Sequence, residues 1–138
     1  MTTTTFTPSA TAVMTDYFRA LRSGDLASLE TLFADDVIWH QPGAGQLSGD
    51  YRGKPSLFEL FGRFVTLSEG TFQITDVGDV MGNGALVAAS LRFRAARGDE
   101  RIDMSGVDLM RIVNGKIQEV WLFSGDQAAE DAFWIGAA

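Results

Sequence analysis

The fold is decided by residues 103–125, which read DMSGVDLMRIVNGKIQEVWLFSG. Two apolar runs flank Asn114-Gly115, a pair that favours a two-residue type I′ turn because both central positions need positive φ. We therefore predict a β-hairpin of two long strands. Side chains alternate between the faces of a strand, so Asp108, Met110 and Ile112 share one face. This pattern sets a carboxylate among core side chains.

Asp108 therefore has two interpretations. The ordinary one is a paired or solvated residue at a sheet edge, and the strand alone favours it. The functional one is an acid in a pocket, because a buried carboxylate without a partner is costly and responds by keeping its proton. A protonated Asp108 would donate a hydrogen bond.

Composition and charge exclude several classes of protein. The 138 residues are 46% hydrophobic, which suits one compact domain at 10–138 after a flexible tail at 1–9. The net charge of −7 argues against a nucleic-acid partner, which needs a basic face. No apolar run is long enough to span a membrane, and the N-terminus lacks the basic and apolar regions of a signal peptide. With no cysteine in the chain, these features favour a cytoplasmic protein.

Helical periodicity predicts three helices in the N-terminal half, at 10–23, 26–34 and 55–68. The apolar stripe of the first one turns Tyr17 inward. The inward stripes of the second and third helices include Leu26, Phe61 and Val65.

Alternating patterns predict strands at 37–41, 71–81, 85–97, 101–113 and 116–124, followed by a short helix at 127–135. Residues 46–53 are predicted to be a surface loop, polar enough to act as a lid. Helices followed by an antiparallel meander indicate an α+β fold, with helices packed on one face of a curved, mainly antiparallel sheet. Both faces of the last strand are apolar, so we expect a homodimer through the sheet.

The strand at 37–41 contributes further candidate site residues. Alternation sets Trp39 and Gln41 on one face and His40 on the other. His40 is the only histidine, and its unperturbed pKa near neutrality suits a general base, although alternation turns it away from Gln41. Trp39, Gln41, Phe61 and Met110 are the candidate ligand contacts, and a core position is the ordinary alternative for each apolar one.

Four motifs resemble the SnoaL-like branch of the NTF2-like superfamily: YFRALRSGD at 17–25, LFADDV at 32–37, YRG at 51–53 and NGKI at 114–117. The resemblance covers about residues 10–126. It implies a cone-shaped α+β scaffold that hosts ketosteroid isomerase, polyketide cyclases and limonene epoxide hydrolase. Fold does not decide function within such a superfamily.

The resemblance to ketosteroid isomerase extends to single residues. It implies that Tyr17 and a protonated Asp108 are the two donors of an oxyanion hole, a pairing known from that enzyme. The position of the isomerase's general base, just before a proline, is Gln41 here, and an amide cannot take a proton. The resemblance to limonene epoxide hydrolase implies instead a carboxylate that activates water, for which Asp126 is a weak candidate.

From these residues we expect a cofactor-free isomerase, cyclase or lyase that acts on a small apolar carbonyl compound. The alternatives are a non-catalytic protein that binds a small ligand, and an epoxide-hydrolase-like enzyme that activates water with a pocket carboxylate. Metal sites need several converging ligands, and this chain has one histidine and separated carboxylates, so we expect neither metal nor cofactor.

Overall fold

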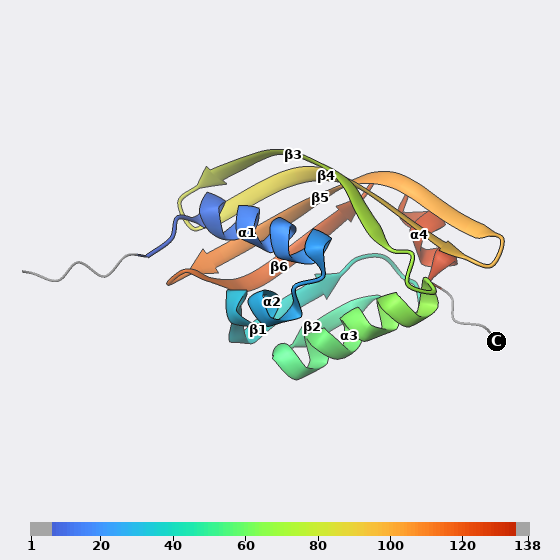
Figure 1. Ribbon diagram of the computed structural model, residues 1–138, viewed down its shortest axis with the longest axis horizontal. Coiled ribbons are helices and arrows are strands. Elements are labelled where there is room, and N and C mark those ends of the chain that lie inside the picture. The colour runs from blue at the N-terminus through green and yellow to red at the C-terminus, as the bar shows by residue number, and fades with distance from the viewer. Residues whose placement is uncertain (1–6, 135–138) are drawn as a thin grey trace, which may run out of the picture.

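Asn114 and Gly115 connect β5 (Glu100–Val113) to β6 (Lys116–Ser124) in the computed structural model of the chain (Figure 1). Their φ angles are 51° and 75°, so both central positions lie in the left-handed region and the predicted turn is confirmed. The two strands pair antiparallel from Gly106 and Ser124 to Val113 and Lys116. This hairpin forms the middle of the sheet.

The structure describes residues 7–134, and within them the chain forms four helices and six strands. The elements besides the hairpin are α1 (Ala10–Ser23), α2 (Leu26–Leu32), β1 (Phe33–Gln41), β2 (Gly49–Arg52), α3 (Lys54–Leu67), β3 (Gln73–Asn83), β4 (Leu86–Arg97) and α4 (Gln127–Phe133). Most of the predicted tail, residues 1–6, and the predicted end of the last helix at 135 lie outside the described residues.

The strands of the described region form one sheet in the order β2-β1-β6-β5-β4-β3. Neighbouring strands pair antiparallel except β1 and β6, which run parallel. The predicted class, α+β with a mainly antiparallel sheet, is therefore confirmed. The sheet is mixed and open, with β2 and β3 at its edges.

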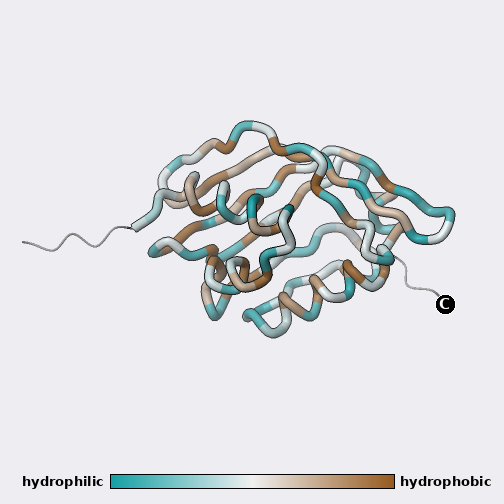
Figure 2. The backbone as a smooth tube through the Cα atoms, viewed as in Figure 1, coloured by the Kyte–Doolittle hydropathy of each residue, from teal (hydrophilic) through white to brown (hydrophobic). Residues whose placement is uncertain are grey.

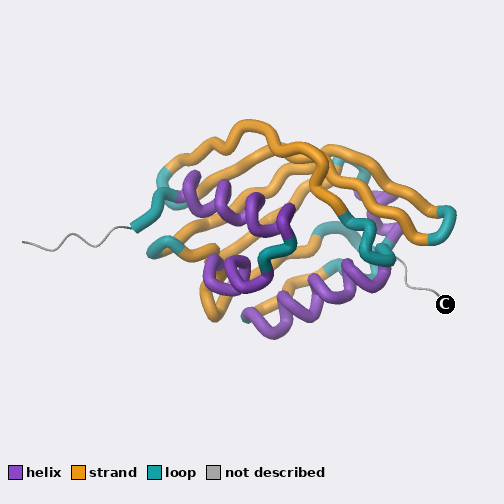
Figure 3. The backbone as a smooth tube through the Cα atoms, viewed as in Figure 1, coloured by secondary structure: helices purple, strands orange, loops and turns teal. Residues whose placement is uncertain are grey.

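The helices α1, α2 and α3 lie on one side of the curved sheet, and α4 closes it at the far end (Figures 1 and 3). Contacts join α1 to β3, β4 and β5, and join α4 to β5 and β6. Hydrophobic and hydrophilic residues alternate along the strands in Figure 2, as expected for a sheet with one buried face. Fully buried members of the core include Met14, Leu57, Leu60, Met110 and Val120.

Two features of the segment 26–53 differ from the prediction. The helix α2 ends at Leu32 because Phe33 already belongs to β1, where it pairs with Ile117 and is buried. Residues 46–53 do not form a free loop: Gly49–Arg52 is the edge strand β2, and the Tyr51 hydroxyl donates to the Leu47 carbonyl at 2.7 Å. Both differences arise from pairing with distant strands, which local periodicity does not encode.

The described residues contain neither a membrane-spanning helix nor a cluster of metal-binding side chains. No helix among residues 7–134 is long and apolar enough to cross a lipid bilayer. The same range holds no cluster of three or more metal-binding side chains.

Candidate functional site

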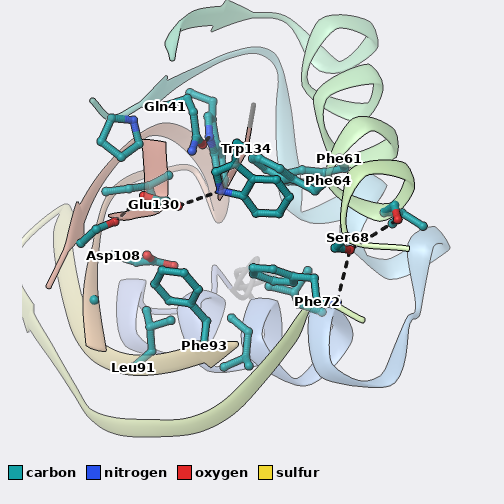
Figure 4. Close-up of a pocket in the computed structure, with 18 of the residues that line it drawn as sticks. Gln41, Phe61, Phe64, Ser68, Phe72, Leu91, Phe93, Asp108, Glu130 and Trp134 are labelled. Carbon is teal, nitrogen blue, oxygen red and sulfur yellow. Dashed lines mark hydrogen bonds between the residues drawn. The ribbon is translucent and has the colours of Figure 1, made fainter. Parts of the chain in front are cut away.

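A cavity of about 270 Å³ lies between the helices and the concave face of the sheet (Figure 4). This volume is slightly below the roughly 300–1,000 Å³ of typical small-molecule sites, so it suits a compact ligand. Its wall is largely apolar, and it includes the aromatic side chains of Trp39, Phe61, Phe64, Phe72, Phe93 and Trp134. Its polar side chains are few: Tyr17, Gln41, Ser68, Asp108, Ser124 and Glu130.

Asp108 lies on the inner face of β5, between Ala89 of β4 and Leu122 of β6. It is only 7% exposed, and its carboxyl has no hydrogen-bond partner among the described residues, so it opens onto the cavity. Burial raises the pKa of Asp108 to about 7, and the negative charge of Glu130 adds to that rise. This carboxyl therefore keeps its proton over most of the acidic range.

Tyr17 reaches the same cavity from α1. Its ring packs edge-on against Phe18 and Phe33, with centroid distances of 5.1 and 6.0 Å. The side chain is 2% exposed, and within residues 7–134 its hydroxyl has no hydrogen-bond partner. Burial raises the pKa of Tyr17 well above its usual value, and the nearby Asp108 raises it further. The phenol is therefore a neutral donor.

Trp39 and Gln41 also line the cavity, from the inner face of β1. The Trp39 indole Nε1 donates to Gln41 Oε1 at 3.0 Å, which fixes the orientation of the amide. The Gln41 Nε2 group is left without an acceptor among the described residues, so it is a third donor available to a ligand. Phe61 of α3 packs edge-on against Trp39 at 5.2 Å and completes this wall.

Glu130 was not among the residues that sequence reasoning selected. It lies on α4, is 7% exposed and lines the cavity close to Asp108 in Figure 4. Three donors reach its carboxylate: Ser124 Oγ at 2.5 Å, Gln127 Nε2 at 3.2 Å and Trp134 Nε1 at 3.1 Å. The sequence did contain a signal for this cluster. Residues three and four apart meet on one face of a helix, and Glu130 follows Gln127 by three residues and precedes Trp134 by four.

The structure places His40 and Met110 outside the cavity. His40 points to the other face of the sheet, where Nδ1 lies 2.7 Å from Asp50 and Nε2 lies 2.6 Å from Glu119. Partial burial acts to lower the pKa of His40, but these two hydrogen bonds outweigh it and raise the pKa. Met110 shares the face of Asp108 but is fully buried in the core, since a step of two residues moves it about 7 Å along the strand.

The entrance of the cavity is apolar. Leu26 of α2 and Val65 of α3 both line it, yet they are 63% and 58% exposed. The prediction that both are buried is wrong, because the helix faces that carry them border an open cavity instead of a filled core. An apolar ligand entering here would cover them.

Two other aspartates considered from the sequence have structural roles. Asp126 accepts a hydrogen bond from the Ala129 backbone N–H at 3.0 Å and caps α4. Asp103 lies on the outer face of β5 and pairs with Arg92 at 2.8 Å. Neither residue lines the cavity.

The sequence of this chain matches a known protein family. The family model of the SnoaL-like domain matches residues 14–120. The chain belongs to the SnoaL-like family. An uncharacterized protein of Mycobacterium tuberculosis is 34% identical over 118 residues, which are 85% of this chain and 89% of the relative.

Solved structures agree with this membership of the SnoaL-like family. A protein of unknown function with a cystatin-like fold from Xanthomonas campestris is 41% identical, with a TM-score of 0.90 over 93% of this chain and 99% of its own. A Kribbella flavida protein assigned as a ketosteroid isomerase is 27% identical, with a TM-score of 0.66 over 87% of this chain and 82% of its own. The predicted resemblance to SnoaL-like and NTF2-like proteins is confirmed.

Proposed function

We propose that this protein is a cofactor-free enzyme of the isomerase or cyclase type, which acts on a small apolar carbonyl compound. One observation carries the proposal: the Tyr17 hydroxyl and the Asp108 carboxyl both open onto one aromatic cavity without a protein partner in the described region. Unpartnered polar groups in a buried site are costly, so a ligand that accepts both hydrogen bonds would relieve that cost.

The two donors suit a carbonyl oxygen on which negative charge develops. A neutral phenol and a protonated carboxyl both donate, and each hydrogen bond strengthens as the oxygen becomes an enolate. The pKa of Asp108, raised to about 7 by burial and by Glu130, supports its role as a donor at neutral pH and below. The aromatic side chains would hold the apolar remainder of the substrate.

Membership of the family supports the reaction class without deciding it. The SnoaL-like and NTF2-like proteins include polyketide cyclases and ketosteroid isomerases. Both reaction types pass through an enol or enolate. The residues Tyr17 and Asp108 stand at the donor positions of the isomerase resemblance described above.

Two observations favour other functions. Gln41 stands where the isomerase resemblance requires a base, and an amide there favours a non-catalytic binding protein that uses the same donors. Glu130 adds a second carboxyl group to the cavity, which favours activation of a water molecule in the manner of an epoxide hydrolase.

Binding of phenols tests the donor pair, because a phenolate oxygen resembles an enolate oxygen. Tyr17→Phe and Asp108→Leu should each weaken the binding of an acidic phenol by roughly 1–3 kcal/mol, the cost of losing a hydrogen bond to a charged group. Met110→Leu is the matched control, since Met110 lies on the face of Asp108 but outside the cavity. Calorimetric affinities that are unchanged in both donor variants would overturn the proposal.

A further inference from the structure

We propose that Glu130 is the general base of the cavity and takes a proton from the carbon next to the substrate carbonyl. The inference rests on the function proposed above. It assigns the proton-transfer step to α4, a helix that follows the last strand and that the resemblance to ketosteroid isomerase does not use.

Elimination narrows the choice of base. Among the described residues that line the cavity, only Tyr17, Asp108 and Glu130 have titratable side chains. Tyr17 is a neutral phenol and Asp108 holds its proton, so both are donors. His40 points to the opposite face of the sheet, where both ring nitrogens are engaged by carboxylates.

The surroundings of Glu130 are built for a carboxylate. Trp134 Nε1 and Gln127 Nε2 are donors only, and they approach different oxygens of the carboxylate at 3.1 and 3.2 Å. Ser124 Oγ supplies the third donor at 2.5 Å. A carboxylate has about four acceptor sites, so one site, on Oε2, is left for a substrate proton.

No cation in the described part of the chain pairs with the Glu130 carboxylate. Within residues 7–134 no lysine, arginine or histidine nitrogen forms an ion pair with Glu130, although the side chain is only 7% exposed. An unpaired buried carboxylate is costly to fold, which is expected at a functional site and not in a structural core. In Figure 4, Glu130 lies between the indole of Trp134 and Asp108, so the two carboxyl groups share one wall of the cavity.

The proposed step balances without a co-reactant. The C–H bond next to the carbonyl breaks, its proton moves to Glu130 Oε2, and its electron pair forms the enolate double bond. The resulting negative charge on oxygen is held by Tyr17 and Asp108. Return of the proton from Glu130 to another carbon of the enolate completes an isomerisation and restores the carboxylate.

Hydrogen–deuterium exchange of small cyclic ketones in D₂O tests this step without knowledge of the natural substrate. Ketones that bind are first selected from a panel by thermal shift, and exchange at the carbon next to the carbonyl is followed by NMR at about pH 6, where Asp108 is protonated. Glu130→Gln should slow the catalysed exchange by about 10²–10⁴-fold, the usual contribution of a positioned base. Asp126→Asn removes the carboxylate that caps α4 outside the cavity but keeps a capping oxygen, and it should leave exchange unchanged.

Two further measurements separate catalysis from structure. Phenol affinity should survive in Glu130→Gln, because Tyr17 and Asp108 remain. Formate added to Glu130→Ala should restore part of the exchange, since the shortened side chain leaves room for a free carboxylate. If Glu130→Gln proves to be misfolded, restoration of exchange by formate in Glu130→Ala still tests the role of the carboxylate.

The possible failures are distinguishable. Exchange that is fully retained in Glu130→Gln would overturn the role of Glu130 and leave the proposed function standing. A wild-type protein that binds none of the ketones, or binds them without any exchange, would overturn the proposed function and the role of Glu130 with it.

Discussion

The proton of Asp108 links the site to the stability of the whole domain. The carboxyl is buried beside Glu130, and its pKa is raised to about 7 by that burial first and by the charge of Glu130 second. In the unfolded chain an aspartate ionises near pH 4. Below about pH 4 both states hold the proton, and between about pH 4 and 7 only the folded state does.

The free energy of unfolding should therefore fall as the pH rises through this window, since the stability due to Asp108 is present below the unfolded pKa and lost as the folded group ionises. A difference of about three pKa units corresponds to at most about 4 kcal/mol. Asp108→Asn should remove most of this slope, and Asp103→Asn, an exposed carboxylate on the same strand, should not. Denaturant unfolding at a series of pH values measures the slope. Equal slopes in the wild type and Asp108→Asn would contradict the assignment.

The sequence predicted correctly those residues whose orientation follows from the regular repeat of a helix or a strand. Helical spacing turns Tyr17 inward, and strand alternation sets Asp108 and Gln41 on the buried face and His40 on the other. Glu130 escaped prediction because a glutamate on a short helix normally faces solvent, and only the docking of α4 buries it. Leu26 and Val65 were placed wrongly for the opposite reason: periodicity identifies an apolar face but not whether a cavity lies beneath it.

Among the elements, α4 depends for its stability on contacts with the rest of the fold. Its seven residues are too few for a stable isolated helix, so its position depends on its partners. Phe133 and Trp134 are buried, and the Asp131 carboxylate accepts from the Ala44 backbone N–H at 2.9 Å. The loop that follows β1 is thereby fastened to the helix that carries Glu130.

Gly43 lies in this loop, next to the side chain of Asp131 on α4. Its φ is 90°, and a Cβ at this position would lie 2.1 Å from Asp131 Oδ1. Gly43→Ala should therefore combine backbone strain with displacement of the Asp131 side chain, which would break its hydrogen bond with Ala44, and should destabilise the domain by about 1 kcal/mol more than strain alone. Gly53→Ala is the matched control, since Gly53 has a φ of 85° but no neighbour nearer than 3.6 Å. Thermal unfolding compares the two, and equal losses would show that the loop does not press on α4.

The whole molecule has a second apolar surface, on the face of the sheet opposite the helices. Val107 and Phe123 form a cross-strand pair there and are 37% and 57% exposed, and Leu109 pairs with Trp121 beside them. His40 stacks on Trp121 with a ring distance of 5.5 Å and adds a polar rim. An apolar sheet face of this kind is a frequent interface between identical subunits.

We expect this outer face to join two copies of the chain. Light scattering at micromolar concentration should give about twice the chain mass of 15.0 kDa.

Val107→Arg sets a charge in the middle of the apolar patch, so it should shift the protein to a monomer, because an unpaired charge buried in an interface is costly. Met81→Arg is the control: Met81 is 66% exposed but lies on the edge strand β3, away from β5 and β6, so this variant should keep the wild-type mass. Val107 does not line the cavity, so the monomeric variant should still bind phenols. Loss of binding together with the dimer would mean that the partner subunit completes the site. A wild type that scatters as a monomer would refute the interface and leave Phe123 and Val107 exposed.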